Sequence, residues 1–228
     1  MAVTDEAIGQ IKAMILSGRL APGSRLPPEQ ELSAELGLSR NSLREAVKAL
    51  EVVRVLDVRR GDGTYVTSLE PRLLLEATAF VVDLQSNSAM LELTEVRRIL
   101  EPAATSMAAS RIDAATLAEL RDSLEAVEKD TSIEDLVEHD LQFHQGIAGA
   151  SGNAYLAGLI DSLSSQTSRA RVWRGIADEG AVDRTVAEHR GIYQALARGD
   201  AQLASALMLT HVSGVERWLR QAKDEISA

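Results

Sequence analysis

Apolar residues recur at helical intervals along the chain except in one β-prone stretch between residues 55 and 67, and this pattern constrains the fold more than any other feature. Before residue 54 the apolar residues recur at helical intervals. The helices predicted there span about 7–17, 28–36 and 40–53. Two β-prone runs follow, Val55 to Val58 and Thr64 to Thr67, on either side of a turn that contains Gly61 and Gly63. Three helices and a hairpin predict a winged helix-turn-helix domain over residues 1–67.

The rest of the chain shows the helical period alone. Short polar or glycine-containing separators divide it, and connections of this length favour antiparallel packing of neighbouring helices. The predicted helices span about 72–84, 89–109, 114–129, 132–149, 153–172, 178–198 and 200–222. The sequence therefore predicts a mostly α protein in which a linker over 68–72 joins the winged domain to an all-α antiparallel bundle over 73–228.

The charge differs between the two parts. The first 67 residues hold nine basic and nine acidic residues, so the net charge of −10 belongs entirely to the second part. A neutral winged domain can still bind DNA when its cations share one face.

The chain has no cysteine, which excludes disulfides and fits a reducing cytoplasm. Because it also lacks a signal-peptide pattern and any run of 18 apolar residues, we expect a cytoplasmic protein without membrane contact.

Cationic and polar side chains gather at the start of the third predicted helix. Arg40 and Arg44 are four residues apart and therefore share one helix face. The N-terminal residues of a recognition helix typically contact base edges in the major groove. Ser39 is a suitable N-cap for this helix. Together with Asn41 and Ser42, it can also donate hydrogen bonds to phosphates or bases.

Two further arginines, Arg59 and Arg60, lie at the tip of the predicted hairpin, where they can reach the minor groove or the DNA backbone.

Three segments of the winged domain resemble a known protein family: LPPEQEL from Leu26, LGLSRNSLREA from Leu36 and GDGTYV from Gly61. In type and spacing they resemble the GntR family of bacterial regulators. That resemblance implies base or phosphate contacts for Arg40 and Arg44, and wing contacts for Arg60 and Gly61.

Two positions depart from the family pattern. Gln30 stands where the family usually carries arginine, so one phosphate contact is expected to be weaker. Arg54 stands where the family usually carries glycine, at the end of the third helix. Arg54 must therefore supply another way to end that helix, or it adds a contact to the DNA backbone.

One aspartate and three histidines interrupt the apolar faces of three predicted helices: Asp140, His144, His189 and His211. Burial of a carboxylate and three imidazoles without partners is expensive, and one divalent cation would satisfy all four. A single buried histidine is usually satisfied by a hydrogen bond instead. These ligands suit Zn, Ni, Mn, Co or Fe, of which we expect Zn, Ni or Mn. His139 lies off the apolar face and is expected to be exposed.

Residues from about 73 to 222 resemble the FCD ligand-binding domain of the FadR subfamily, a bundle of six or seven helices. The metal motif of that domain, Asp-x-x-x-His followed by two later histidines, matches Asp140, His144, His189 and His211 without departure. The resemblance implies a small carboxylate effector, often a hydroxy or sugar acid, at or beside the metal.

A carboxylate effector needs a cation besides the metal, and Arg97 is the candidate. It shares an inward stripe with apolar residues of the predicted helix over 89–109. A planar guanidinium can hold a carboxylate through two hydrogen bonds. An internal ion pair of Arg97 with Glu101 or Asp140 is the alternative. Thr185 could bond an effector hydroxyl and Trp173 could wall the pocket, although core packing explains both equally well.

The sequence thus predicts a ligand-responsive, sequence-specific transcription regulator, with a repressor expected. It would bind a palindromic operator as a homodimer and sense a small organic acid at a metal site. One alternative is a constitutive DNA-binding regulator whose metal is purely structural. The other is a metal-dependent hydrolase or oxygenase, which is disfavoured because no additional inward carboxylate accompanies the cluster and such an enzyme has no evident use for a winged helix.

Overall fold

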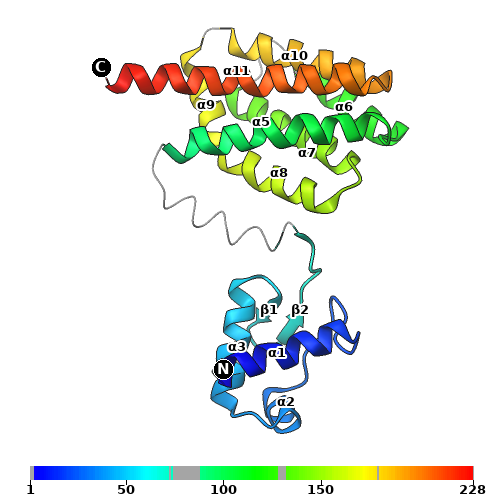
Figure 1. The fold of residues 1–228 in the computed structure, drawn as a ribbon, viewed down its shortest axis with the longest axis vertical. Helices are drawn as coiled ribbons and strands as arrows, with labels where there is room; N and C mark the ends of the chain where they lie inside the picture. The colour runs from blue at the N-terminus through cyan, green and yellow to red at the C-terminus, as the bar shows by residue number, and fades with distance from the viewer. Residues whose placement is uncertain (1–2, 72, 74–87, 128–131, 179, 228) are drawn as a thin grey trace. The chain divides into compact units, whose positions relative to one another are not determined.

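The computed structural model describes residues 3–71, 73, 88–127, 132–178 and 180–227. The chain divides into two compact units, residues 1–77 and 78–228 (Figure 1). The predicted linker over 68–72 lies within the first unit, with residue 72 outside the described part. The helix predicted over 72–84 lies outside the described residues except for residue 73.

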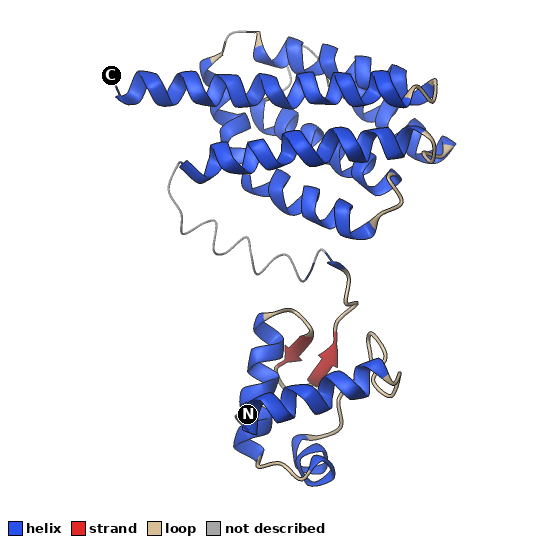
Figure 2. Ribbon diagram, in the orientation of Figure 1, coloured by secondary structure: helices blue, strands red, loops and turns tan. Residues whose placement is uncertain are grey.

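The first unit is the predicted winged helix-turn-helix. Its elements are α1 (Val3–Leu16), α2 (Glu29–Leu36), α3 (Arg40–Val52), β1 (Leu56–Arg59) and β2 (Gly63–Val66). The two strands are antiparallel and pair Leu56 with Val66 (Figure 2). Each element contributes buried apolar side chains to one core, among them Ile11, Leu32 and Leu43. The core fixes α3 against α1 and α2, as a recognition helix requires.

The start of α3 is set by two local signals. Gly37 ends α2 in the left-handed conformation with a φ of 67°, which a glycine adopts without a steric penalty. Ser39 then caps α3, because its Oγ accepts a hydrogen bond from the backbone N–H of Ser42 at 3.1 Å. The predicted N-cap is therefore present, and Arg40 is the first residue of the helix.

Arg54 follows the end of α3 with a φ of 60°, in the left-handed region where a side chain is strained. Its backbone N–H donates to the carbonyl of Glu51 at 3.0 Å, and its carbonyl accepts from the hydroxyl of Thr67 at 2.7 Å. The chain thus makes with arginine the helix-ending turn for which glycine is usually used.

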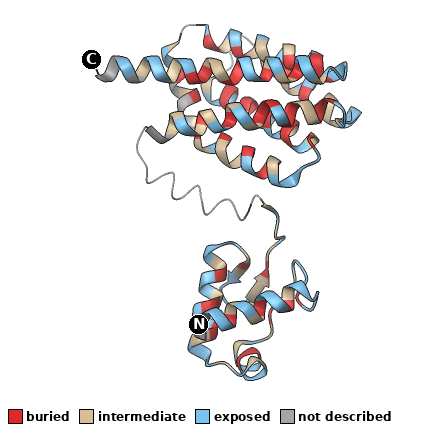
Figure 3. Cartoon of the chain, in the orientation of Figure 1, coloured by how far each residue is buried: buried red, intermediate tan, exposed pale blue. Residues whose placement is uncertain are grey.

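The second unit is a helical bundle. Its helices are α5 (Ser88–Ala109), α6 (Ala114–Ala126), α7 (Ile133–Ala150), α8 (Ala154–Gln166), α9 (Ser168–Ala177), α10 (Ala181–Ala197) and α11 (Ala201–Ser227). The long helices α5 and α11 lie side by side (Figure 1). Buried residues line the inward faces, including Phe143, Ile192 and Met208 (Figure 3). None of the helices described in either unit is long and apolar enough to cross a membrane.

The single helix predicted over 153–172 is wrong, because α8 ends at Gln166 and α9 begins at Ser168. Thr167 lies between them and is completely buried. Its hydroxyl lies 3.0 Å from the carbonyl oxygen of Leu163 and accepts a hydrogen bond from Nη1 of Arg97, also at 3.0 Å. A threonine hydroxyl that engages the last carbonyls of a helix competes with its continuation. The break gives α9 a direction that differs from that of α8 (Figure 1).

The strain at Arg54 predicts a stabilising substitution. Arg54→Gly should raise the opening free energy of the α3 amides by about 1 kcal/mol, because glycine tolerates the left-handed conformation. Native-state hydrogen exchange on the full chain measures this quantity. Arg60→Gly, at a residue without positive φ, is the matched control and should not stabilise α3. Equal or lower protection in Arg54→Gly would contradict the strain argument.

Candidate metal and effector site

The four residues proposed as metal ligands converge inside the bundle. Asp140 and His144 lie one turn apart on α7, while His189 comes from α10 and His211 from α11. All four are at least 96% buried. Each offers one ligand atom to a common centre, and these atoms lie within 4.8 Å of one another.

The spacing of these atoms suits a small ion. Oδ1 of Asp140 lies 3.6 Å from Nε2 of His144, 3.3 Å from Nε2 of His189 and 3.7 Å from Nε2 of His211. Nε2 of His211 lies 3.2 and 3.3 Å from the other two imidazole Nε2 atoms. Tetrahedral ligands at a metal distance of about 2.0–2.1 Å are separated by about 3.3 Å. The donor set and its geometry therefore fit a divalent transition metal.

The outer atoms of three of the ligands lie within ion-pair distance of charged side chains. Nδ1 of His144 lies 2.5 Å from a carboxylate oxygen of Glu101, and Nδ1 of His211 lies 2.7 Å from one of Glu188. Oδ2 of Asp140 lies 2.6 Å from Nε of Arg171. Such outer contacts fix the orientation of metal ligands and raise their basicity.

His139 is buried, contrary to the expectation that it is exposed. Its Nε2 lies 3.2 Å from Nδ1 of His189, and its Nδ1 lies 2.7 Å from the hydroxyl of Ser123 on α6. The apolar stripe of α7 underestimated the buried face, because α6 and α10 cover this helix on the side of His139. The width of the buried face of α7 is determined by its neighbouring helices, and the apolar stripe of a single helix does not reveal them.

Burial and neighbouring charges set the protonation of the cluster. Burial opposes ionisation of Asp140, but Arg171 and His144 outweigh it and hold the pKa of this carboxyl well below its usual range. Burial lowers the pKa of His189 to about 3, so its imidazole is neutral as metal binding requires. Burial also opposes the charged form of His211, yet Asp140 and Glu188 raise its pKa above the ordinary value.

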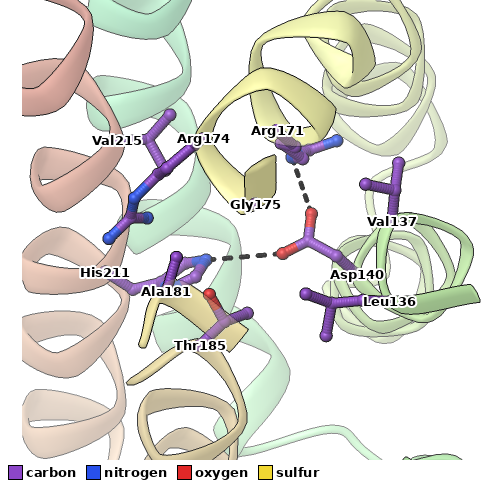
Figure 4. Close-up of a pocket in the computed structure, with 10 residues that line it drawn as sticks. All are labelled: Leu136, Val137, Asp140, Arg171, Arg174, Gly175, Ala181, Thr185, His211 and Val215. Carbon is purple, nitrogen blue, oxygen red and sulfur yellow. Dashed lines mark ion pairs between the residues drawn. The ribbon is translucent and has the colours of Figure 1, made fainter. Parts of the chain in front are cut away.

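A cavity of about 30 Å³ adjoins the cluster (Figure 4). It is lined by Leu136, Val137, Asp140, Arg171, Arg174, Gly175, Ala181, Thr185, His211 and Val215. Arg171 and Arg174 of α9 are both more than 90% buried. Nη2 of Arg171 is buried and has no hydrogen-bond partner among the described residues. The sequence reasoning missed both arginines, because the helix break at Thr167 that directs α9 was not predicted.

The three predicted effector residues differ in position. Thr185 lines the cavity and is 92% buried. Arg97 is almost completely buried, but its Nε pairs with Glu101 at 2.5 Å, and Arg97 is absent from the cavity lining. This ion pair is the alternative that the sequence left open for Arg97. Trp173 belongs to α9, and its side chain lies outside the described part of the structure.

The predicted DNA-contacting residues lie mainly on exposed positions of the winged domain. Arg40 and Asn41 are exposed at the first turn of α3, and Arg60 and Gly61 at the tip of the hairpin. Ser39 and Ser42 bond each other through their hydroxyls at 2.8 Å. Nε of Arg44 pairs with Glu29 at 2.7 Å. Arg59 pairs with Asp57 and covers the ring of Tyr65 at 4.3 Å.

Metal addition should stabilise the chelator-treated protein. An ion at one hundred times its dissociation constant contributes about 2.7 kcal/mol when it binds only the folded state. Melting temperatures with Zn²⁺, Ni²⁺ or Mn²⁺ measure this effect. His144→Ala should abolish it, whereas Gln142→Ala, an exposed position on the same helix, should retain it. A wild-type protein that no ion stabilises, or a His144→Ala variant that is stabilised equally, would contradict the assignment.

Comparison with known proteins identifies both parts of the chain. Residues 3–66 match the gntR family of bacterial regulatory proteins, and residues 92–214 match the FCD domain. The transcriptional regulator LutR of Bacillus subtilis is 32% identical over 211 residues, which cover 89% of this chain and 94% of LutR. The galactonate operon transcriptional repressor of Escherichia coli is 28% identical over 96% of this chain and 97% of its own.

A solved structure of GntR from Streptococcus agalactiae has a TM-score of 0.72 and 25% identity, and the match covers 94% of this chain and 99% of that one. The matching families and relatives are transcription regulators rather than enzymes. The chain therefore belongs to the GntR family of bacterial transcription regulators, with a winged helix-turn-helix DNA-binding domain followed by an FCD ligand-binding domain.

Proposed function

We propose that this regulator binds a palindromic operator as a homodimer and releases it when a small carboxylic acid binds beside a metal ion. Asp140, His144, His189 and His211 hold the metal, with Zn, Ni or Mn as the candidates. The observation that carries the proposal is a buried Asp/His cluster that adjoins a cavity lined by two buried arginines.

The charge balance of the interior favours an anionic effector. The deeply buried cations at the site are Arg97, Arg171 and Arg174, and the deeply buried anions are Glu101 and Asp140. The less deeply buried Asp178 pairs with Arg174, and Glu188 pairs with His211, so four carboxylates balance the three arginines before a metal binds. A divalent ion adds two positive charges, which these carboxylates do not fully offset. Uncompensated buried charge is costly, so an acid that enters the cavity is attracted by both the metal and the arginines.

The unpartnered Nη2 of Arg171 gives this attraction a direction. The guanidinium already holds Asp140 through Nε, so Nη2 remains for a carboxylate oxygen of the effector. Thr185, on the cavity wall, can bond a hydroxyl of the same molecule. A hydroxy or sugar acid satisfies all these groups together. The name of the galactonate operon repressor, which refers to a sugar acid, supports this class of effector.

The size of the cavity suggests how effector binding produces a conformational signal. Its volume of about 30 Å³ suffices for water but not for a sugar acid. The effector must therefore displace α9 or the side chains that it carries. A conformational shift follows only when the effector favours one arrangement over the other, and the acid has contacts only in the wider one. We propose that this displacement is the signal passed to the DNA-binding domains.

A purely structural metal is the second candidate, because four protein ligands can complete a tetrahedral site. The regulator would then bind DNA whether or not an acid is present. The unpartnered donor of Arg171 and the cavity beside Asp140 favour the acid-responsive mechanism.

Arg174 separates these two mechanisms. Arg174→Met should weaken the acid-induced release of operator DNA at least about 10-fold, because the cavity loses one of the two arginines that attract the acid. Fluorescence anisotropy with an operator selected from a random DNA pool measures this release for a panel of hydroxy and sugar acids. Arg184→Met is the matched control, since Arg184 shares Asp178 with Arg174 but is absent from the cavity lining. If no acid releases DNA from the metal-loaded wild type, the structural role is correct.

On the DNA side, Arg44 must leave Glu29 to reach a base or phosphate. Arg44→Ala should weaken operator binding by about 1–3 kcal/mol, the usual contribution of a good arginine–guanine pair. Arg19→Ala removes an equal charge from an arginine outside α3 and should have a much smaller effect. Titrations at fixed salt measure both affinities. Equal losses in the two variants would mean that Arg44 contributes only its charge.

A further inference from the structure

The three imidazoles of the metal cluster differ in what their outer nitrogens contact. Nδ1 of His144 and Nδ1 of His211 each lie within 2.7 Å of a glutamate oxygen. Nδ1 of His189 instead faces Nε2 of another imidazole, that of His139, at 3.2 Å. The metal proposal alone does not explain this third contact, since His139 offers no ligand atom to the cluster.

We propose that His139 is a positioning residue that holds His189 in the tautomer and orientation required for metal binding. The inference rests on the metal site proposed above. His189 can offer the lone pair of Nε2 to a metal only when its proton is on Nδ1. That N–H then donates to Nε2 of His139, which must carry its own proton on Nδ1. The proton on Nδ1 is donated to the hydroxyl oxygen of Ser123, 2.7 Å away.

The direction of each hydrogen bond follows from this order. Ser123 is the acceptor for His139, His139 is the acceptor for His189, and Nε2 of His189 is left free for the ion. Ser123 lies on α6, whereas His139 and His189 lie on α7 and α10. This chain of hydrogen bonds, the Ser123–His139–His189 relay, therefore couples α6, which carries no metal ligand, to the geometry of the cluster.

The ring of His189 is fixed from two sides by α7. Phe143 stacks on its face, with ring centroids 4.1 Å apart and an angle of 11° between the planes. His139, one turn earlier on the same helix, holds its edge. Stacking alone leaves the ring free to flip by a half-turn about the Cβ–Cγ bond, because the flipped ring lies in the same plane and stacks equally well on Phe143. The hydrogen bond to His139 removes that freedom and points Nε2 at the ion.

A test compares His139→Ala with His139→Gln and Ser123→Ala in the full-length protein. The glutamine oxygen can accept from Nδ1 of His189, so His139→Gln tests for an acceptor rather than for a filled volume. Zn²⁺ affinity is measured by competition with a chelator, and the melting temperature of the metal-free protein is measured alongside. Leu124→Ala, a buried apolar truncation on α6, is the matched control for a general loss of packing.

We expect His139→Ala to weaken Zn²⁺ binding by about 10–100-fold, the usual effect of removing an outer partner of a ligand. His139→Gln should recover most of the affinity, Ser123→Ala should show a smaller loss, and Leu124→Ala should lower the melting temperature with little change in affinity. The Nδ1–H signal of His189 in the proton NMR spectrum of the Zn²⁺-bound protein should persist in His139→Gln and broaden in His139→Ala. If His139→Ala does not fold, the other two relay variants carry the test.

Two results would overturn the inference. Wild-type affinity in His139→Ala would mean that His189 needs no partner, while the metal site itself stands. Equal losses in His139→Ala, His139→Gln and Leu124→Ala would mean that His139 only fills space. A wild-type protein that binds no Zn²⁺, Ni²⁺ or Mn²⁺ is a different failure, because it removes the metal site on which the inference rests.

Discussion

The buried carboxylate of Asp140 is the constraint on which the helical domain depends. A buried anion must be paired, and no single neighbouring helix supplies enough partners. One oxygen faces imidazoles from α7, α10 and α11, and the other faces Arg171 from α9. Four helices must therefore meet at one point. The break at Thr167 makes this possible, because it gives the segment that carries Arg171 a direction of its own.

A second buried ion pair, between Arg97 and Glu101, lies next to the pair formed by Asp140 and Arg171. Arg97 and Glu101 on α5 are both almost completely buried, and Glu101 also holds Nδ1 of His144. Burial opposes ionisation of Glu101, but Arg97 and His144 outweigh it and keep its pKa below the usual range. The interior thus contains paired charges at the site and an apolar core elsewhere, among α5, α6, α7, α10 and α11. In the mechanism proposed above, an anion that enters the cavity acts on α9 through Arg171 and Arg174, which line it.

The sequence predicted the features that depend on the residue pattern of a single helix. The winged domain followed from local period and turns, and the inward stripes of three helices identified Asp140 and its histidines. What depends on the packing between helices was missed. His139 was placed outside because only the stripe of α7 was visible, and Arg174 was overlooked because the break before α9 depends on the buried hydroxyl of Thr167. For Arg97 the inward direction was predicted correctly, and its role toward an effector stays a prediction.

Anomalous X-ray diffraction from crystals of the metal-loaded protein tests the central claim most directly. The account predicts one peak per chain, about 2.0–2.3 Å from Oδ1 of Asp140 and from Nε2 of each of His144, His189 and His211. It also predicts that the outer nitrogens keep their contacts, so that no imidazole binds through Nδ1. A peak elsewhere in the domain, or coordination through Nδ1 of His189, would contradict the account.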